Sequence, residues 1–100
     1  MKKYAIIAAA VLFGLANTAW AGSGDAAAGK AKSETCAACH GPDGNSAAPN
    51  FPKLAGQSED YMQFVLKQYR SKQRSNAIMN GQAEKLTDKE IADLTAYYAL

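Results

Sequence analysis

The chain has 100 residues, a formal net charge of +2 and two cysteines, and a chain of this length accommodates one domain. The basic excess comes from Lys2 and Lys3, because the rest of the chain carries as many acidic as basic side chains. This balance excludes a nucleic-acid-binding protein, which would show a basic surplus gathered into a patch.

The first 21 residues have the pattern of an export signal. Two lysines precede an apolar run at positions 4–16, and Ala19 and Ala21 place small residues where a signal peptidase reads. A membrane-crossing helix needs roughly 20 apolar residues, more than this run provides. We therefore expect residues 1–21 to be a cleaved signal peptide and residues 22–100 to form one periplasmic domain, with no membrane insertion after cleavage.

The next two segments are a helix and a long loop. Asp25 is expected to cap a helix that runs to about residue 38. Gly29 lies inside this helix, where it costs about 1 kcal/mol relative to alanine, so a close contact with another element is expected there. Residues 41–57 are rich in Gly, Pro, Asn and Ser and predict an irregular loop. So long a loop in so small a domain normally wraps around something.

Two further helices are expected in the second half of the chain. Ser58 caps the first of them, which carries Met62, and Thr87 with Glu90 forms a capping box that opens the last one. A second loop at 75–86, which carries Met79, is expected between them. No segment alternates as a strand does, so the fold class is all-α. The end of the middle helix is basic and is either a docking patch or a complement to the helix dipole: Lys67, Arg70, Lys72 and Arg74.

The stretch C-A-A-C-H places both cysteines and the only histidine together: Cys36, Cys39 and His40. A structural zinc site would need a second ligand pair, and a thiol redox motif usually sits in a βαβ unit, which this chain lacks. A disulfide closing so short a loop would stabilise the fold little. At the end of a helix, however, the two thiols lie one turn apart and reach both vinyl groups along one edge of a porphyrin. The motif therefore predicts one haem c, bound covalently through the two cysteines.

The predicted haem also gives a small domain the core that its length cannot supply. His40 is expected to bind the iron from one side. A haem that only moves electrons is normally closed on both faces, and a Met/His pair raises its potential. Met62 sits in a helix as a core methionine would, whereas Met79 lies in a loop, so Met79 is the expected second ligand, with packing near the haem edge as its alternative.

Four stretches carry a resemblance to a known family: C-A-A-C-H-G, P-K-L-A-G-Q, I-M-N-G and L-T-D-K-E-I-A-D-L-T-A-Y-Y. The chain resembles small single-haem class I bacterial cytochromes c and is similar to one half of the two-haem periplasmic cytochromes c. The resemblance implies a class I cytochrome c fold, with three main helices plus loops wrapped around one haem. It also implies that the Pro52 carbonyl accepts the second N–H of His40, that Leu54 packs on the haem face, and that Gly29 meets Tyr97 or Tyr98 where the first and last helices cross.

The predicted function is one-electron transfer in the periplasm. No carboxylate pair, second histidine or nucleophile constellation is present, so an enzyme is not expected. The expected partners are redox proteins such as a membrane quinol–cytochrome c reductase, a terminal oxidase or a periplasmic dehydrogenase, and the chain is expected to be a monomer. One alternative is a cytochrome subunit of a periplasmic dehydrogenase. Another is a haem enzyme or gas sensor in which Met79 is displaced.

Overall fold

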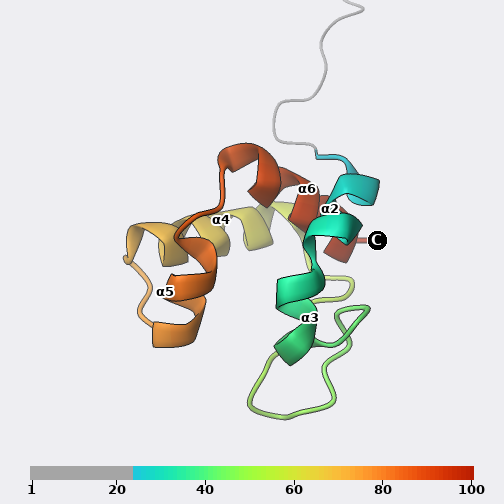
Figure 1. The fold of residues 1–100 in the computed structure, drawn as a ribbon, viewed down its shortest axis with the longest axis horizontal. Helices are drawn as coiled ribbons and strands as arrows, with labels where there is room; N and C mark the ends of the chain where they lie inside the picture. Colours follow the sequence, from blue (N-terminus) through green and yellow to red (C-terminus); the bar gives the residue numbers. More distant parts are fainter. Residues whose placement is uncertain (1–23) are drawn as a thin grey trace, which may run out of the picture.

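The computed structural model describes residues 24–100, which form five helices and no strand (Figure 1). The all-α prediction is therefore confirmed for this part of the chain, and the predicted signal peptide lies outside it. None of the helices described here has the length and apolar character that crossing a bilayer requires. The helices are α2 (Ala26–Lys32), α3 (Glu34–His40), α4 (Glu59–Ser71), α5 (Ala77–Ala83) and α6 (Asp88–Tyr98).

The first predicted helix is divided into two by Ser33. The Asp25 side chain accepts hydrogen bonds from the amides of Ala27 and Ala28, as expected of a helix cap. At Ser33, however, the hydroxyl donates to the Lys30 carbonyl at 2.7 Å, a local bond that competes with the helical pattern. The helix restarts as α3 and continues to His40, two residues further than expected.

α2 crosses α6 at Gly29, which explains the glycine inside this helix. A Cβ atom at this position would overlap the backbone carbonyl of Asp93 and would lie 2.9 Å from the Tyr97 Cβ. The resemblance left Tyr97 and Tyr98 open as the aromatic residue at this crossing, and the structure places Tyr97 there. Without a side chain at position 29, the two helices approach with their backbones almost in contact.

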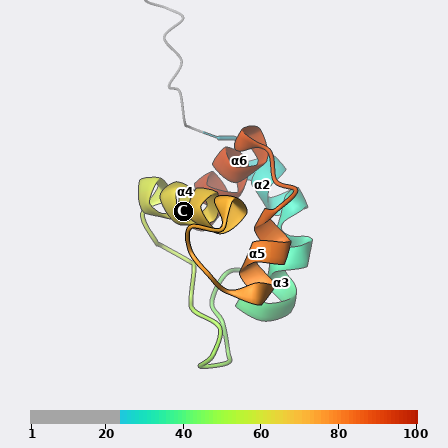
Figure 2. The ribbon, with the colours of Figure 1, turned by 90° about the vertical axis from the view of Figure 1, so that its left-hand side faces the viewer.

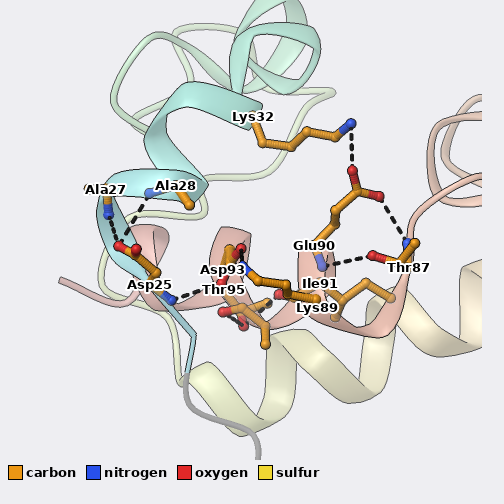
Figure 3. A network of polar contacts seen from close by, with 11 residues as sticks. Asp25, Ala27, Ala28, Lys32, Thr87, Lys89, Glu90, Ile91, Asp93 and Thr95 are labelled. Atoms are coloured by element: carbon orange, nitrogen blue, oxygen red, sulfur yellow. Dashed lines mark hydrogen bonds and ion pairs between the residues drawn. The ribbon is translucent and has the colours of Figure 1, made fainter.

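Polar contacts along one side of this crossing attach the start of the domain to α6 (Figure 3). The buried Asp93 carboxylate accepts from the Asp25 amide at 2.8 Å and from the Lys89 Nζ at 2.6 Å. The hydrogen bond from the Asp25 amide, followed by that from Lys89, lowers the pKa of Asp93 below its usual value. Lys32 of α2 also pairs with Glu90 at 2.9 Å. Charge and backbone contacts therefore fix the N-terminal helix on the last one.

The apolar core is small and lies between α4 and α6. Its buried members are Met62, Leu94 and Tyr98, and the half-buried Leu54 and Cys36 pack against them. The long loop at 41–57 is irregular, as predicted, and is attached at its base: the Gly44 carbonyl accepts from Leu54 and Ala55, and the Gly56 amide donates to the Tyr98 carbonyl at 2.8 Å. The rest of this loop extends away from the helices in both views (Figures 1 and 2).

The prediction of a loop at 75–86 is wrong in one respect, because this segment contains the helix α5. Asn76 caps this helix by accepting from the Met79 amide at 3.0 Å, and Gly81 continues the helix without interrupting it. Met79 therefore lies on a helix and not on free loop backbone. The sequence lacks an apolar period here, and the contacts that hold α5 come from α4, which explains why composition alone indicated a loop.

Candidate functional site

A cavity of about 550 Å³ opens between the helices, within the 300–1,000 Å³ usual for a small-molecule or cofactor site. Residues of both α3 and α5 line it, and these two helices lie apart from each other, below α4 and α6, in Figure 1. In the view turned by 90° (Figure 2), α3 and α5 lie one behind the other, which agrees with their separation in Figure 1. Six residues predicted from the sequence line this cavity together: Cys36, Cys39, His40, Pro52, Leu54 and Met79.

α3 brings both thiols to the cavity wall. Cys36 and Cys39 are half-buried and unpaired, and their spacing of one helical turn places them on the same face of the helix. Burial raises the pKa of the Cys36 thiol, which lies beside the Tyr98 hydroxyl. Two adjacent thiols that face one apolar cavity suit covalent attachment of an apolar group at two points along one edge.

His40, the last residue of α3, is buried and has a fixed orientation. Its Nδ1 lies 2.7 Å from the Pro52 carbonyl oxygen. A carbonyl can only accept, so Nδ1 carries a proton, and in the neutral ring Nε2 is the nitrogen with the free lone pair. A metal-binding histidine is usually held in this way, with one nitrogen bonded to a carbonyl and the other directed at the metal. The contact implied by the resemblance between His40 and Pro52 is therefore present in the structure.

Two methionines line the cavity, and they differ in their surroundings. Met62 of α4 is buried and belongs to the apolar core with Leu94 and Tyr98. Met79 of α5 is half-buried and lies across the cavity from α3. Of these two, Met79 is therefore the one whose thioether the core does not already enclose, and its role as a ligand stays a prediction.

Tyr98 adds a polar group that the sequence did not indicate. The resemblance implied Tyr98 only as one of two candidates for the crossing with Gly29, yet the residue lines the cavity and its hydroxyl is buried beside the Cys36 thiol. Burial raises the pKa of Tyr98, so this hydroxyl is a neutral donor. Its polar neighbours are the side chains of Cys36 and Ser33, so this hydroxyl joins α6 to the helix that carries the two thiols.

The donor set of the cavity fits a haem and does not fit a bare metal ion. Within residues 24–100, no group of three His, Cys, Asp or Glu side chains is placed to hold an ion by itself. The cavity instead offers two thiols on one wall, an imidazole nitrogen beside them, a thioether opposite and largely apolar surroundings. An extended apolar ring that brings its own in-plane ligands for iron matches this arrangement. The residues present therefore fit the predicted haem c.

The basic cluster at the end of α4 is largely occupied by contacts within the chain. Arg70 pairs with Asp88 at 2.7 Å and donates to the Leu86 carbonyl at 3.0 Å. Arg74 donates to the Gln68 side chain and lies over the Tyr69 ring. Two of the four cations thus help to join α4 to the following segments, and the docking interpretation rests on Lys67 and Lys72.

Comparisons of this chain with known proteins all point to one family. The family model described as Cytochrome c matches residues 26–98. A cytochrome c4 of Pseudomonas aeruginosa is 50% identical over 88 residues, which cover 88% of this chain and 42% of the relative. Cytochrome c-554(548) of Halomonas halodenitrificans is 49% identical over 80 residues, covering 77% of this chain and 96% of the relative.

A solved structure agrees with these sequence matches. The crystal structure of reduced recombinant cytochrome c4 from Pseudomonas stutzeri superposes with a TM-score of 0.73 at 42% identity, covering 77% of this chain and 45% of that one. The chain thus spans less than half the length of the two cytochrome c4 proteins but nearly all of the Halomonas protein.

Proposed function

The chain belongs to the cytochrome c family, and we propose from this premise that it is an exported one-electron carrier with a single haem. Its cofactor is haem c, attached through the cysteine pair. When bound, the haem supplies a one-electron couple between Fe(III) and Fe(II). The observation that carries the proposal is that both thiols, the oriented ring of His40 and the thioether of Met79 line one cavity.

Each of these side chains has a distinct task in the proposal. Cys36 and Cys39 anchor the haem along one edge. His40 binds the iron through Nε2, and the Pro52 carbonyl keeps the ring oriented and increases the basicity of that nitrogen. Met79 would supply a thioether ligand, and its soft sulfur would favour Fe(II) and raise the reduction potential.

The lining of the cavity is better suited to electron transfer than to the conversion of a substrate. The apolar side chains around the site keep water away, and a dry environment also raises the potential. With His40 and Met79 as ligands, neither side of the ring offers a position to a substrate. The chain is therefore proposed to be a carrier and not an enzyme. The apolar lining includes Leu54, Val65, Leu66, Leu86 and Leu94.

The location follows from the N-terminal pattern. In this proposal, residues 1–21 direct export and are removed, and residues 22–100 act as a monomeric domain in the periplasm. The support is the basic start followed by a short apolar run and small residues at the expected cleavage site.

The partners are redox proteins, and the proposed candidates are a quinol–cytochrome c reductase, a terminal oxidase or a periplasmic dehydrogenase. Lys72 is exposed at the end of α4 and is suited to weak, charge-guided contacts. Reversal of its charge in Lys72→Glu should slow electron exchange with an acidic partner at low salt and have little effect at high salt. If the wild type and Lys72→Glu exchange electrons at equal rates at low and at high salt, the contact at Lys72 is excluded.

The axial ligand provides the test of the proposed function. The optical spectrum of the oxidised wild-type protein should show the weak far-red band of a sulfur–Fe(III) bond. Met79→Ala should lose this band, and its reduced form should bind carbon monoxide. Met62→Leu is the matched control, because Met62 lines the same cavity and should leave the band in place.

Two results would contradict the assignment. A far-red band that persists in Met79→Ala would remove Met79 from the iron. A band lost in Met62→Leu but kept in Met79→Ala would transfer the role to Met62.

A further inference from the structure

Asn80, the residue after Met79, joins three separate segments through one side-chain amide. Its Nδ2 donates to the Tyr69 carbonyl at 2.8 Å and to the Arg74 carbonyl at 2.9 Å. Its Oδ1 accepts from the Asn76 amide at 3.0 Å. Both donors and the acceptor are therefore engaged, and all three partners are backbone atoms.

These partners lie where α4 ends and α5 begins. Tyr69 belongs to the last turn of α4, where its carbonyl also accepts from the Lys72 amide at 3.2 Å, and Arg74 lies in the turn that follows. Asn76 is the cap of α5. The Asn80 amide thus fixes the end of one helix, the connecting turn and the start of the next helix relative to one another.

Apart from its cap at Asn76 and the buried Ala83, α5 has few features that stabilise it. It has only seven residues, too few for a helix to persist on its own, and it contains Gly81. It has no acidic residue in its first turn and no basic residue in its last turn to favour its dipole. Ile78, beside Met79, is 56% exposed, so the small side chain of Ala83 supplies the burial of this helix. The position of α5 therefore depends on contacts such as those of Asn80.

We propose that Asn80 is a positioning residue for the Met79 thioether. Its two hydrogen bonds to the end of α4 and to the turn hold α5 so that Met79 stays at the cavity wall opposite α3. This inference rests on the proposed role of Met79 as a ligand. The side chain of Asn80 does not bind the iron itself. It acts through the backbone that carries the ligand, and substitution of such supporting residues typically weakens metal binding by 10–100-fold.

Asn80→Asp is the sharpest variant, because it keeps the oxygen that accepts from Asn76 and removes both donors to α4 and the turn. Asn80→Ala removes all three bonds and serves as a second variant. Thr87→Ala is the matched control, since it removes a cap from α6 and destabilises the domain without touching α5. The protein used in each case is the purified haem-containing chain.

The readout is competition between Met79 and added imidazole for the oxidised iron, followed optically. Imidazole must displace Met79, so a weaker hold on the thioether increases the apparent affinity for imidazole by the same factor. We expect an increase of about tenfold or more for Asn80→Asp and Asn80→Ala, together with a weaker far-red band. Thr87→Ala should lower the unfolding temperature and leave the affinity for imidazole unchanged.

The outcomes separate this inference from the proposed function. If Met79→Ala keeps the far-red band, the ligand assignment itself is wrong, and the inference is wrong with it. If Met79→Ala loses the band but the Asn80 variants bind imidazole as the wild type does, Met79 is the ligand and Asn80 does not position it. An equal rise in affinity in Thr87→Ala would show an effect of general stability and would also overturn the inference.

Discussion

Gly29→Ala tests whether the close approach of α2 and α6 holds the domain together. The added methyl group would overlap the Asp93 carbonyl oxygen and would lie 2.6 Å from the Asp93 carbonyl carbon and 2.9 Å from the Tyr97 Cβ. Two of these three atoms belong to the backbone, so a change of rotamer cannot relieve the overlap. The helices have to move apart, which also strains the 2.8 Å hydrogen bond from the Asp25 amide to Asp93.

The cost can be worked from two opposing effects. Overpacking costs about 1–3 kcal/mol, and contact with backbone atoms places this site at the upper end. Alanine recovers about 1 kcal/mol through its better helix propensity. We therefore expect a net loss of about 2 kcal/mol, which lowers the unfolding temperature of a domain of this size by roughly 8–16 °C.

Gly81→Ala is the matched control for this experiment. Gly81 also lies inside a helix, but no atom beyond the backbone of its own helix lies within 4 Å of the position that a Cβ would take, so the substitution gains propensity without a clash. It should stabilise the protein by about 0.5–1 kcal/mol. Thermal and guanidinium unfolding of the haem-containing proteins measure both effects. If the two variants change stability in the same direction, the crossing at Gly29 does not have the role described.

Three further predictions concern stability. Asp93→Asn should have a lower unfolding temperature than the wild type at neutral pH, and this difference should narrow as the pH falls below about 4. The reason is that a carboxylate with a lowered pKa stabilises the fold above its unfolded-state pKa of about 3.9, and this stabilisation is lost as the pH falls through the folded-state pKa. A difference in unfolding temperature that does not change between pH values of about 2 and 7 would contradict this. Thr87→Ala removes the hydrogen bond that the Glu90 amide donates to the Thr87 hydroxyl, and it should lower the free energy of unfolding in guanidinium by about 1 kcal/mol. An unchanged free energy of unfolding would exclude a role for the capping box. Lys72→Gly should raise the free energy of unfolding by about 0.5–1 kcal/mol, because Lys72 has a φ of 69° at the end of α4, in the left-handed region that favours glycine. A lower free energy of unfolding would show that the Lys72 side chain makes a stabilising contact.

Much of the fold could be predicted because its signals are local. The caps at Asp25, Ser58 and Thr87 were predicted from short patterns, and each makes the expected hydrogen bond to a nearby backbone amide. Gly29 was predicted to mark a close contact because a glycine inside a helix costs stability. The attachment motif needed only five consecutive residues, since both thiols and the imidazole come from one helix.

The features that the sequence did not reveal depend on contacts between distant residues. α5 was missed because it is short, and because its contacts, such as the hydrogen bonds from the Asn80 amide to the Tyr69 and Arg74 carbonyls, come from outside the helix. The break at Ser33 coincides with the hydrogen bond from its hydroxyl to the Lys30 carbonyl, and the sequence does not show that the side chain makes this bond. The buried hydroxyl of Tyr98 could not be located beside the Cys36 thiol until the helices were placed around the cavity. The roles of His40 and Met79 as iron ligands remain predictions that the geometry supports.

The central claim is that one haem is bound covalently through the two cysteines of α3. Intact mass spectrometry of the purified exported protein, after denaturation and treatment with a thiol-alkylating reagent, tests it most directly. The account predicts a polypeptide heavier by one haem, with neither Cys36 nor Cys39 alkylated. A chain without added haem mass, alkylated at both cysteines, would contradict it.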